Sequence, residues 1–334
     1  MSARFWKQLA VILRRLSPGF VQREANRPFS LAVVGAGEEV CRWRDRLAPP
    51  GISERKRAQA LKPLFTIPAP LTPAYAQMLP KFDLLWVTPS AADEVRGLTR
   101  RYTLLPEAPD GGAEETDWAD AIMEEVRERH AGFRLALARH YVPLRRAAIS
   151  QVISAIALEN AAFAVLSAIP NVIPSPIELP WVIGEFASDT VAITANQLRM
   201  AFLIAAASDS PVGWSRQKGQ LAAIAGSAFG WRALARELAG KMPGGTGLLA
   251  KGLVAYSATH VVGWGLEHFY RLGHYFTRAE KLELYQEAHR RGRKRVEELA
   301  GRLTGRRLPP RRPPARSHGE TPEAASGAWL PEAE

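Results

Sequence analysis

The residues with the clearest capacity for chemistry are Gly35 and Gly37, which follow an apolar run and precede a helical pattern. A glycine turn at the amino terminus of a helix can cradle a phosphate group. A phosphate-binding loop starting at Gly35 would need glycine, lysine and a hydroxyl residue at 40–42, where the chain has valine, cysteine and arginine. Glu38 and Glu39 would also repel phosphate. The spacing predicts a structural turn, and Gly35 and Gly37 are only weak candidates for cofactor binding.

Other catalytic and metal-binding patterns are missing from the sequence. It contains neither H-E-x-x-H nor G-x-S-x-G. Cys41 is the only cysteine, which excludes an intrachain disulfide and a zinc site built from several thiolates. His268 and His274 are six positions apart, a spacing that does not put two ligands on one helical face. Glu159 and Asp189 lie in apolar surroundings, and we assign them no chemistry. We expect no catalytic residues, no metal and no cofactor, and the sequence leans away from an enzyme.

The part of the chain that holds the two glycines consists of short apolar runs that alternate with helical patterns. The runs end at glycine, proline or polar residues, as buried strands of a parallel sheet do. Ser90 followed by Asp93 is typical of a helix start with a capping acid. We expect a small, truncated parallel α/β domain over 28–112. Its predicted strands are Ser30–Ala36, Leu64–Ile67, Phe82–Thr88 and Tyr102–Leu105, and its predicted helices are Glu38–Leu47 and Glu94–Leu98.

The character of the sequence changes after Asp117, where helical spacing and then alanine dominate. We expect a larger all-α, alanine-rich domain over 113–275. A capping box at Thr277–Glu280 predicts a charged helix over 276–304. Proline and arginine in 305–334 predict a disordered basic tail. The fold class is therefore α+β and multi-domain, with a small parallel α/β layer followed by a larger helical domain.

Positive charge gathers at the two ends of the chain. The formal net charge is +11. Eleven basic residues between Arg290 and Arg316, against Glu297 and Glu298, give that stretch +9, and residues 1–27 carry +5. Two basic ends on a near-neutral body indicate an anionic partner, either lipid headgroups or nucleic acid.

The first 27 residues predict a basic amphipathic helix followed by a linker that begins at Ser17-Pro18-Gly19. Arg14 and Arg15 interrupt the apolar run, so the segment is not typical of a secretory signal. Phe5, Trp6 and four aliphatic residues share one face of the helix. Such a face can lie in a membrane interface or pack on the protein itself, and amphipathicity alone does not choose.

Three apolar segments are candidates for membrane-spanning helices, which need about 20 apolar residues. Val152–Val172 carries Glu159 near its middle, and Trp181–Ala207 contains three charged residues. Gly252–Leu266 is uncharged but short. Basic residues flank this region and also occur inside it, so crossings would have to come in pairs. The alternatives are one helical hairpin or no crossing, and we favour membrane association over a multi-span protein.

The helical region resembles the bacterial domain family of unknown function numbered 697. The resemblance lies in "LARHYVPLRRAAISQVISAIALENAAFA", "ANQLRMAFLIA", "RALARELAGKMPGG" and "KGLVAYSATHVVGWGLEHFYRLG". It implies a helical domain attached to, or partly inserted in, the cytoplasmic membrane. The motif positions, whose role is unknown, are Asn160, Asn196, Gln197, Tyr256, Thr259 and Gly263.

The same resemblance implies that the α/β domain is a degenerate relative of a GTPase domain, because the family often follows one. The phosphate-loop lysine and hydroxyl are replaced in this chain, and D-x-x-G and N-K-x-D are missing around the FDLLWV strand. We therefore expect hydrolysis to be lost.

These observations favour a non-catalytic scaffold or adaptor at the cytoplasmic membrane, with most of the chain on the cytoplasmic face. The expected partner is anionic membrane lipid, and a protein partner or a second copy of the chain stays open. One alternative is a nucleotide-responsive switch that uses the degenerate α/β domain. Another is nucleic-acid binding through the basic tail, which is less favoured because Arg290–Arg316 has no interleaved aromatic residues for base stacking.

Overall fold

The computed structural model describes residues 17–106, 117–168, 189–226 and 247–304. Contacts between Cα atoms divide the chain into two units. The first, here called the sheet unit, comprises Pro18–Gln151 and Leu203–Gly213. The second, here called the helical unit, contains the described residues of Met1–Ser17, Val152–Phe202 and Trp214–Glu334. The predicted amphipathic helix at 1–16 and the predicted tail at 305–334 lie outside the described residues.

A four-stranded parallel sheet forms the centre of the sheet unit, with the order β2-β1-β3-β4. Leu31 of β1 pairs with Leu64 of β2 on one side and Leu84 of β3 on the other. The predicted fold class is confirmed, since this small parallel layer precedes a larger helical part. The strands are β1 (Leu31–Gly35), β2 (Leu64–Pro68), β3 (Leu84–Val87) and β4 (Thr103–Leu104).

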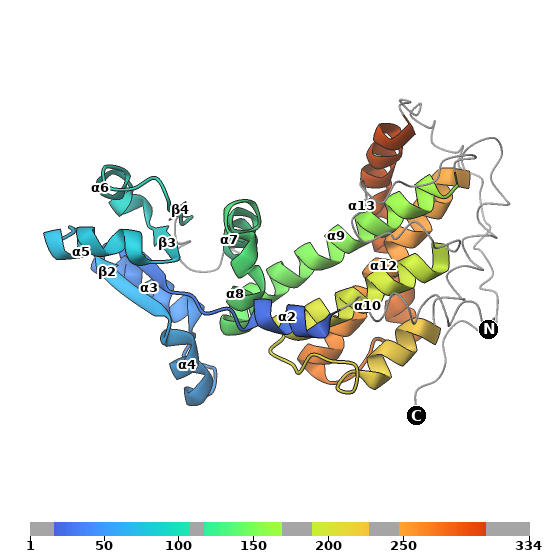
Figure 1. Ribbon diagram of the computed structural model, residues 1–334, viewed down its shortest axis with the longest axis horizontal. Helices are drawn as coiled ribbons and strands as arrows, with labels where there is room; N and C mark the ends of the chain where they lie inside the picture. Colours follow the sequence, from blue (N-terminus) through green and yellow to red (C-terminus); the bar gives the residue numbers. More distant parts are fainter. Residues whose placement is uncertain (1–16, 107–116, 169–188, 227–246, 305–334) are drawn as a thin grey trace. The chain divides into compact units, whose positions relative to one another are not determined.

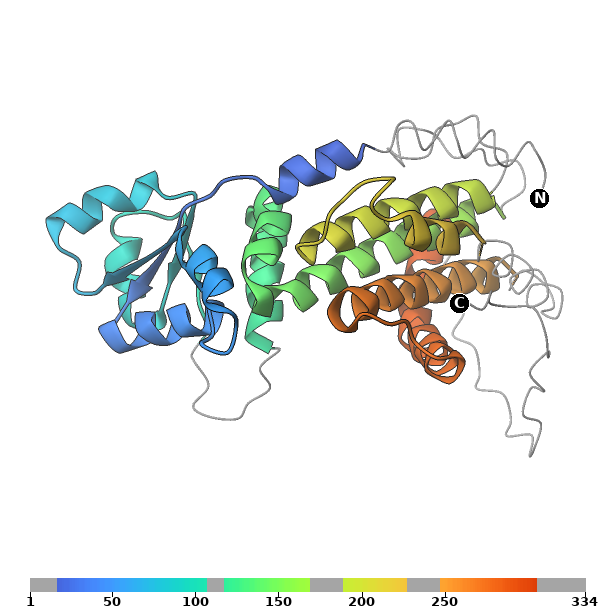
Figure 2. The same ribbon diagram turned by 90° about the horizontal axis from the view of Figure 1, so that it is seen from below.

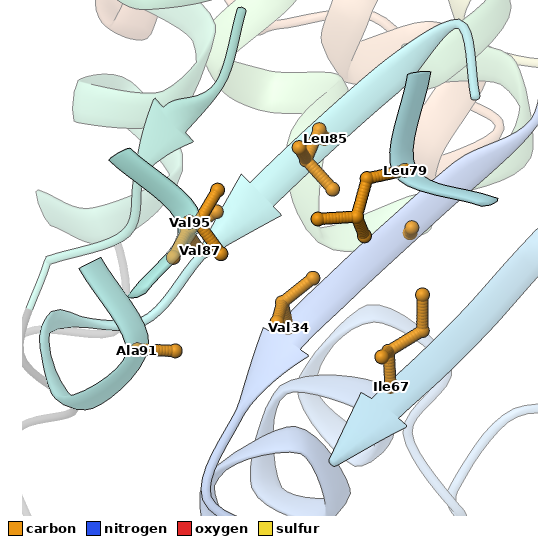
Figure 3. Close-up of a cluster of buried hydrophobic side chains, with 8 residues drawn as sticks. Val34, Ile67, Leu79, Leu85, Val87, Ala91 and Val95 are labelled. Atoms are coloured by element: carbon orange, nitrogen blue, oxygen red, sulfur yellow. The ribbon is translucent and has the colours of Figure 1, made fainter. Parts of the chain in front are cut away.

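Helices cover both faces of this sheet. On one face, alternate strand residues such as Val34 and Val87 meet Leu79 and Val95 in a buried cluster (Figure 3). On the other face, α3 (Gly37–Leu47) packs against β1 and β2, and its Trp43 ring lies 5.4 Å from that of Trp118 in α7. The remaining elements of this region are α2 (Pro18–Ala25), α4 (Glu54–Leu61), α5 (Pro73–Met78), α6 (Ala92–Arg96), α7 (Asp117–Arg129), α8 (Arg134–His140) and the 3-10 helices η1 (Leu79–Lys81), η2 (Pro89–Ala91), η3 (Ala131–Phe133) and η4 (Val142–Leu144).

Long helices make up most of the rest of the described structure, and all of them except the last are apolar. They are α9 (Arg145–Leu166), α10 (Asp189–Ala207), α12 (Gly247–Leu272) and α13 (Arg278–Thr304). Both views show α9, α10 and α12 running side by side (Figures 1 and 2). Gly273, with φ of 85°, ends α12 in the left-handed conformation that glycine adopts without strain. The predicted capping box then starts α13, because the Thr277 N–H donates to Glu280 and the Glu280 N–H donates back to the Thr277 hydroxyl.

The structure differs from the sequence-based expectation in two local features. The predicted linker after residue 17 is helical, since Pro18 begins α2, and proline is tolerated in the first turn because its missing N–H has no helical partner there. Ser90 does not cap a helix with Asp93. Its hydroxyl instead donates to Glu39 of α3, and α6 begins after Ala91 with no side-chain cap.

Candidate functional site

The carboxyl ends of β1 and β3 mark the place where open parallel sheets most often bind a ligand. Because β2 and β3 lie on opposite sides of β1, the direction of winding reverses between β1 and β3. Gly35 ends β1, Gly37 begins α3, and Thr88 directly follows β3. The two candidate glycines therefore lie where a phosphate-binding turn would be.

The carboxylate of Glu39 lies at these strand ends, in the place here called the crevice. Its Oε2 accepts hydrogen bonds from the Thr88 hydroxyl at 2.6 Å, from the Ser90 hydroxyl, and from the Ala36 N–H at 3.3 Å. These two hydroxyls and the N–H at the start of α3 are the donors that a bound phosphate would use. An incoming anion would have to displace a tethered negative charge that already holds all three.

Close packing against Thr88 explains why residue 35 is a glycine. A Cβ on this residue would overlap the Thr88 side chain, with Cγ2 only 2.7 Å away, so glycine is what allows the end of β3 to approach the end of β1. Gly37 differs, because a Cβ there would have no heavy atom within 4 Å. Packing therefore accounts for glycine at 35, and nothing in the described structure explains glycine at 37.

The hydrogen bonds to Glu39 favour its charged form. Burial raises the pKa of the Glu39 carboxyl, but the hydrogen bonds and one nearby cation outweigh burial and lower it below 4.5 overall. The groups that lower it are Ser90, Thr88, the Ala36 N–H and Arg42.

This lowered pKa predicts a pH-dependent contribution to stability. Because the pKa is lower in the folded state, the contribution is complete above pH 4.5 and is lost as the pH falls through the folded-state value. We expect Glu39→Gln to reduce the free energy of unfolding at pH 7 by about 1 kcal/mol. Urea midpoints of the wild type and the variant should converge between pH 7 and pH 3. Glu38→Gln, at the exposed neighbouring position, is the control. An equal difference at both pH values would contradict the expectation.

Three of the six motif positions meet inside the helical unit. The Asn196 amide donates to Asn160 Oδ1 at 2.9 Å, and the Asn160 amide donates to Thr259 Oγ1 at 2.9 Å. The Thr259 hydroxyl in turn donates to the Ala255 carbonyl at 2.7 Å. Asn160 and Thr259 are fully buried. This buried polar chain joins α9, α10 and α12 and fixes their relative register.

The other three motif positions are buried at packing contacts in the same helices. Gln197 is 1% exposed. Tyr256 packs against α9 and α13, and its ring centroid lies 4.5 Å from that of His260. A Cβ on Gly263 would lie 2.6 Å from Ile153 Cγ1 of α9. All six positions are therefore buried among the described helices of this unit.

Two ionisable side chains of the helical unit, Glu159 and His260, are paired or enclosed by their neighbours. Glu159 is ion-paired with Arg199. The turn at Gly273 brings the His268 and His274 rings to 4.8 Å, although their spacing would separate them on a continuous helix. Burial and the nearby Arg295 lower the pKa of His260 to about 4. Among the described residues, no group of three or more histidine, cysteine or acidic side chains has the arrangement of a metal site.

Sequence reasoning missed Thr88 and Ser90 as members of the crevice. A signal for them existed: both follow the predicted strand Phe82–Thr88, and the carboxyl ends of adjacent parallel strands meet at one edge. Sequence reasoning also missed Gln217, whose buried amide donates to the Tyr270 hydroxyl at 2.7 Å and to the Ala201 carbonyl at 3.0 Å. No short motif marks that residue.

Comparisons of the chain with protein-family models, with curated proteins and with solved structures found no significant match. The family resemblance and the functional reading that rests on it therefore stay predictions.

One described helix, Val142–Leu166, has the length and apolar composition needed to cross a membrane. However, 67% of the most apolar 18-residue stretch of this helix is buried inside the protein. The core helix of a soluble protein has the same length, composition and burial. This helix is weak evidence for a crossing.

Proposed function

We propose that this protein is a membrane-associated adaptor that performs no catalysis and binds anionic lipid at the cytoplasmic face. The observation that carries the proposal is a row of exposed basic side chains on α13, here called the basic stripe. It consists of Arg291, Lys294, Arg295 and Arg302. Intervals of three, four and seven residues put these side chains on one helical face.

Most of the positive charge in the basic stripe is not neutralised locally. Arg291 is ion-paired with Glu287, and Arg293, outside the stripe, with Glu297. For Lys294, Arg295 and Arg302, the described part of the chain offers no carboxylate within ion-pair distance. Each basic residue close to an anionic membrane surface contributes about 1 kcal/mol, so the stripe alone supports reversible binding. The sequence continues into a tail with five more arginines between 306 and 316.

Two features favour this function over its alternatives. The crevice of the sheet unit is filled by Glu39, which weighs against a nucleotide-responsive switch. The basic stripe contains no aromatic ring, and the rings of α13, Tyr285 and His289, are partly buried. Single-stranded nucleic acid is usually held by stacking on exposed rings, so lipid suits this surface better.

Vesicle co-sedimentation of the full chain tests the proposal. We expect Lys294→Glu with Arg295→Glu to weaken binding to vesicles containing phosphatidylglycerol by at least about thirtyfold, since two favourable charges of about 1 kcal/mol each are replaced by repulsive ones. Binding to vesicles of phosphatidylcholine alone should not change. Arg55→Glu with Lys56→Glu, which alters net charge equally at two exposed positions of α4, is the matched control and should bind nearly as well as the wild type.

Two outcomes would overturn the proposal. One is equal binding of the α13 variant and the control to anionic vesicles at low salt. The other is tighter binding of the wild type to duplex DNA or RNA than to those vesicles, abolished by the same α13 substitutions, which would assign the basic stripe to nucleic acid instead.

A further inference from the structure

The sheet ends at β4, and among the described residues no strand pairs with the outer side of β4. The Leu105 N–H donates to the Val87 carbonyl of β3 at 2.8 Å. Successive residues of a strand direct their main-chain groups to opposite sides, so the N–H and C=O of Leu104 point away from β3. The Leu104 side chain is also 53% exposed. An open edge of this kind is a template for another strand.

A groove with a volume of about 700 Å³ lies along this edge. Arg96 and Arg100, at and just after the end of α6, form one wall, and Ile122 and Arg129 of α7 form the other. Tyr102 and Leu104 line it from the strand itself. In a longer α/β sheet, the next strand lies beside the edge strand, between the helices of the two faces. The groove therefore has the position of a fifth strand.

The charge of the groove selects an acidic occupant. Arg129 is ion-paired with Glu125 at 2.8 Å, and Arg96 with Asp93 at 2.9 Å. Arg100 is exposed, and no carboxylate in the described part of the chain lies within ion-pair distance of it. The groove thus carries excess positive charge directly beside the outward-facing main-chain groups of Leu104.

We propose that the groove binds an extended acidic segment of a partner protein, which pairs with β4 as a fifth strand. Main-chain hydrogen bonds to Leu104 supply affinity, and a carboxylate beside Arg100 supplies selectivity. The site lies wholly within the sheet unit and uses no residue of the basic stripe. The proposed peptide binding therefore goes beyond lipid binding, and a failure of one proposal leaves the other unaffected.

Peptide binding in solution, without vesicles, tests the proposal with the full-length protein. The probe is a fluorescein-labelled peptide of alternating valine and glutamate, about six residues long, which matches a typical strand. Fluorescence anisotropy should show saturable binding. Arg100→Glu should weaken it about tenfold, because a charge beside the peptide carboxylate is reversed. Arg101→Glu is the matched control, since Arg101 is exposed next to Arg100 but does not line the groove.

A second arm separates strand pairing from simple charge attraction. A peptide of the same sequence, N-methylated at alternate residues, keeps its charge but loses half of its main-chain donors, and it should not bind. Leu104→Pro, which removes the outward N–H, should likewise abolish binding of the unmodified peptide.

Three outcomes would overturn the proposal: equal weakening by Arg100→Glu and Arg101→Glu, equal binding of the N-methylated peptide, or no binding of the unmodified peptide. A chain in which the acids at 107, 110, 114 and 115 are changed to amides provides a further check. If the peptide bound only to that chain, the occupant of the groove would be this protein's own acidic segment, and the proposal would be wrong.

Discussion

Replacing Asn160 with alanine is expected to lower the free energy of unfolding by about 2–4 kcal/mol. Asn160 stands in the middle of the buried polar chain and connects Asn196 to Thr259. Its removal leaves the Asn196 amide without its acceptor in a nearly dry environment, and it opens a cavity between α9, α10 and α12. Denaturant titration followed by far-UV circular dichroism would show the midpoint shift.

Ser257→Ala is the matched control for Asn160→Ala. Ser257 is also fully buried, but its hydroxyl donates only to the Leu253 carbonyl of its own helix at 2.7 Å. Its loss should cost less than about 1 kcal/mol because no second helix loses a partner. Equal destabilisation by the two substitutions would mean that the hydrogen bonds of Asn160 to the other two helices add nothing to the free energy of unfolding. If the Asn160 variant does not fold, Thr259→Val provides the milder test of the same chain.

Alanine at Gly263 and alanine at Gly265 should change stability in opposite directions, although both positions lie in the middle of α12. A Cβ at 263 would lie 2.6 Å from Ile153 Cγ1, with Cδ1 and Cγ2 also close, so either the Ile153 side chain or α9 itself must shift. We expect Gly263→Ala to destabilise the protein by about 1–3 kcal/mol through overpacking. At Gly265 a Cβ would meet no heavy atom within 4 Å. Gly265→Ala should stabilise by up to about 1 kcal/mol, since alanine favours helix.

Thermal unfolding of the two variants beside the wild type is sufficient to measure this contrast. Stabilisation by both alanines would show that Ile153 moves aside without cost and that Gly263 has no packing role. An Ile153→Ala background supplies the internal control, because removing the obstructing side chain should make Gly263→Ala neutral or favourable there.

The sheet could be predicted from the sequence because its signals are local. The runs at Ser30–Ala36 and Phe82–Thr88 are apolar and end at polar or small residues, and they became β1 and β3, which are buried throughout. The helices α4 and α5 were not predicted. They span eight and six residues, and almost all of their residues are exposed or only partly buried, so no apolar periodicity marks them.

The crevice was only partly predictable. The sequence placed Gly35 and Gly37 at the correct turn and identified the acids at 38 and 39 as unfavourable to phosphate. It did not show that Glu39, rather than Glu38, turns inward, because that depends on hydroxyls from Thr88 and Ser90 some 50 positions later. The buried polar chain was beyond reach for the same reason, since three residues on separate helices meet only after the bundle forms.

The histidine pair shows how a periodicity argument can fail. A separation of six positions excludes a shared face only if the helix continues through both residues. Here α12 ends at Leu272, and Gly273 turns the chain so that His274 returns to His268. A glycine one residue before the second histidine was the available signal.

The spacing of the buried polar chain along the sequence has a consequence for how this protein is made. Asn160 and Thr259 are separated by 99 positions. At translation speeds of about 5–20 residues per second, roughly 5–20 seconds pass between the synthesis of the asparagine and that of its partner. In the second half of this interval, after residue 207, α9 and α10 have been synthesised but α12 is not yet there to cover them. The nascent chain therefore exposes apolar helix surface, and the Asn160 amide lacks its acceptor on Thr259. Exposed apolar surface of this kind is what chaperones and proteases recognise. A ribosome that stalls before residue 259 leaves the helical unit unable to close.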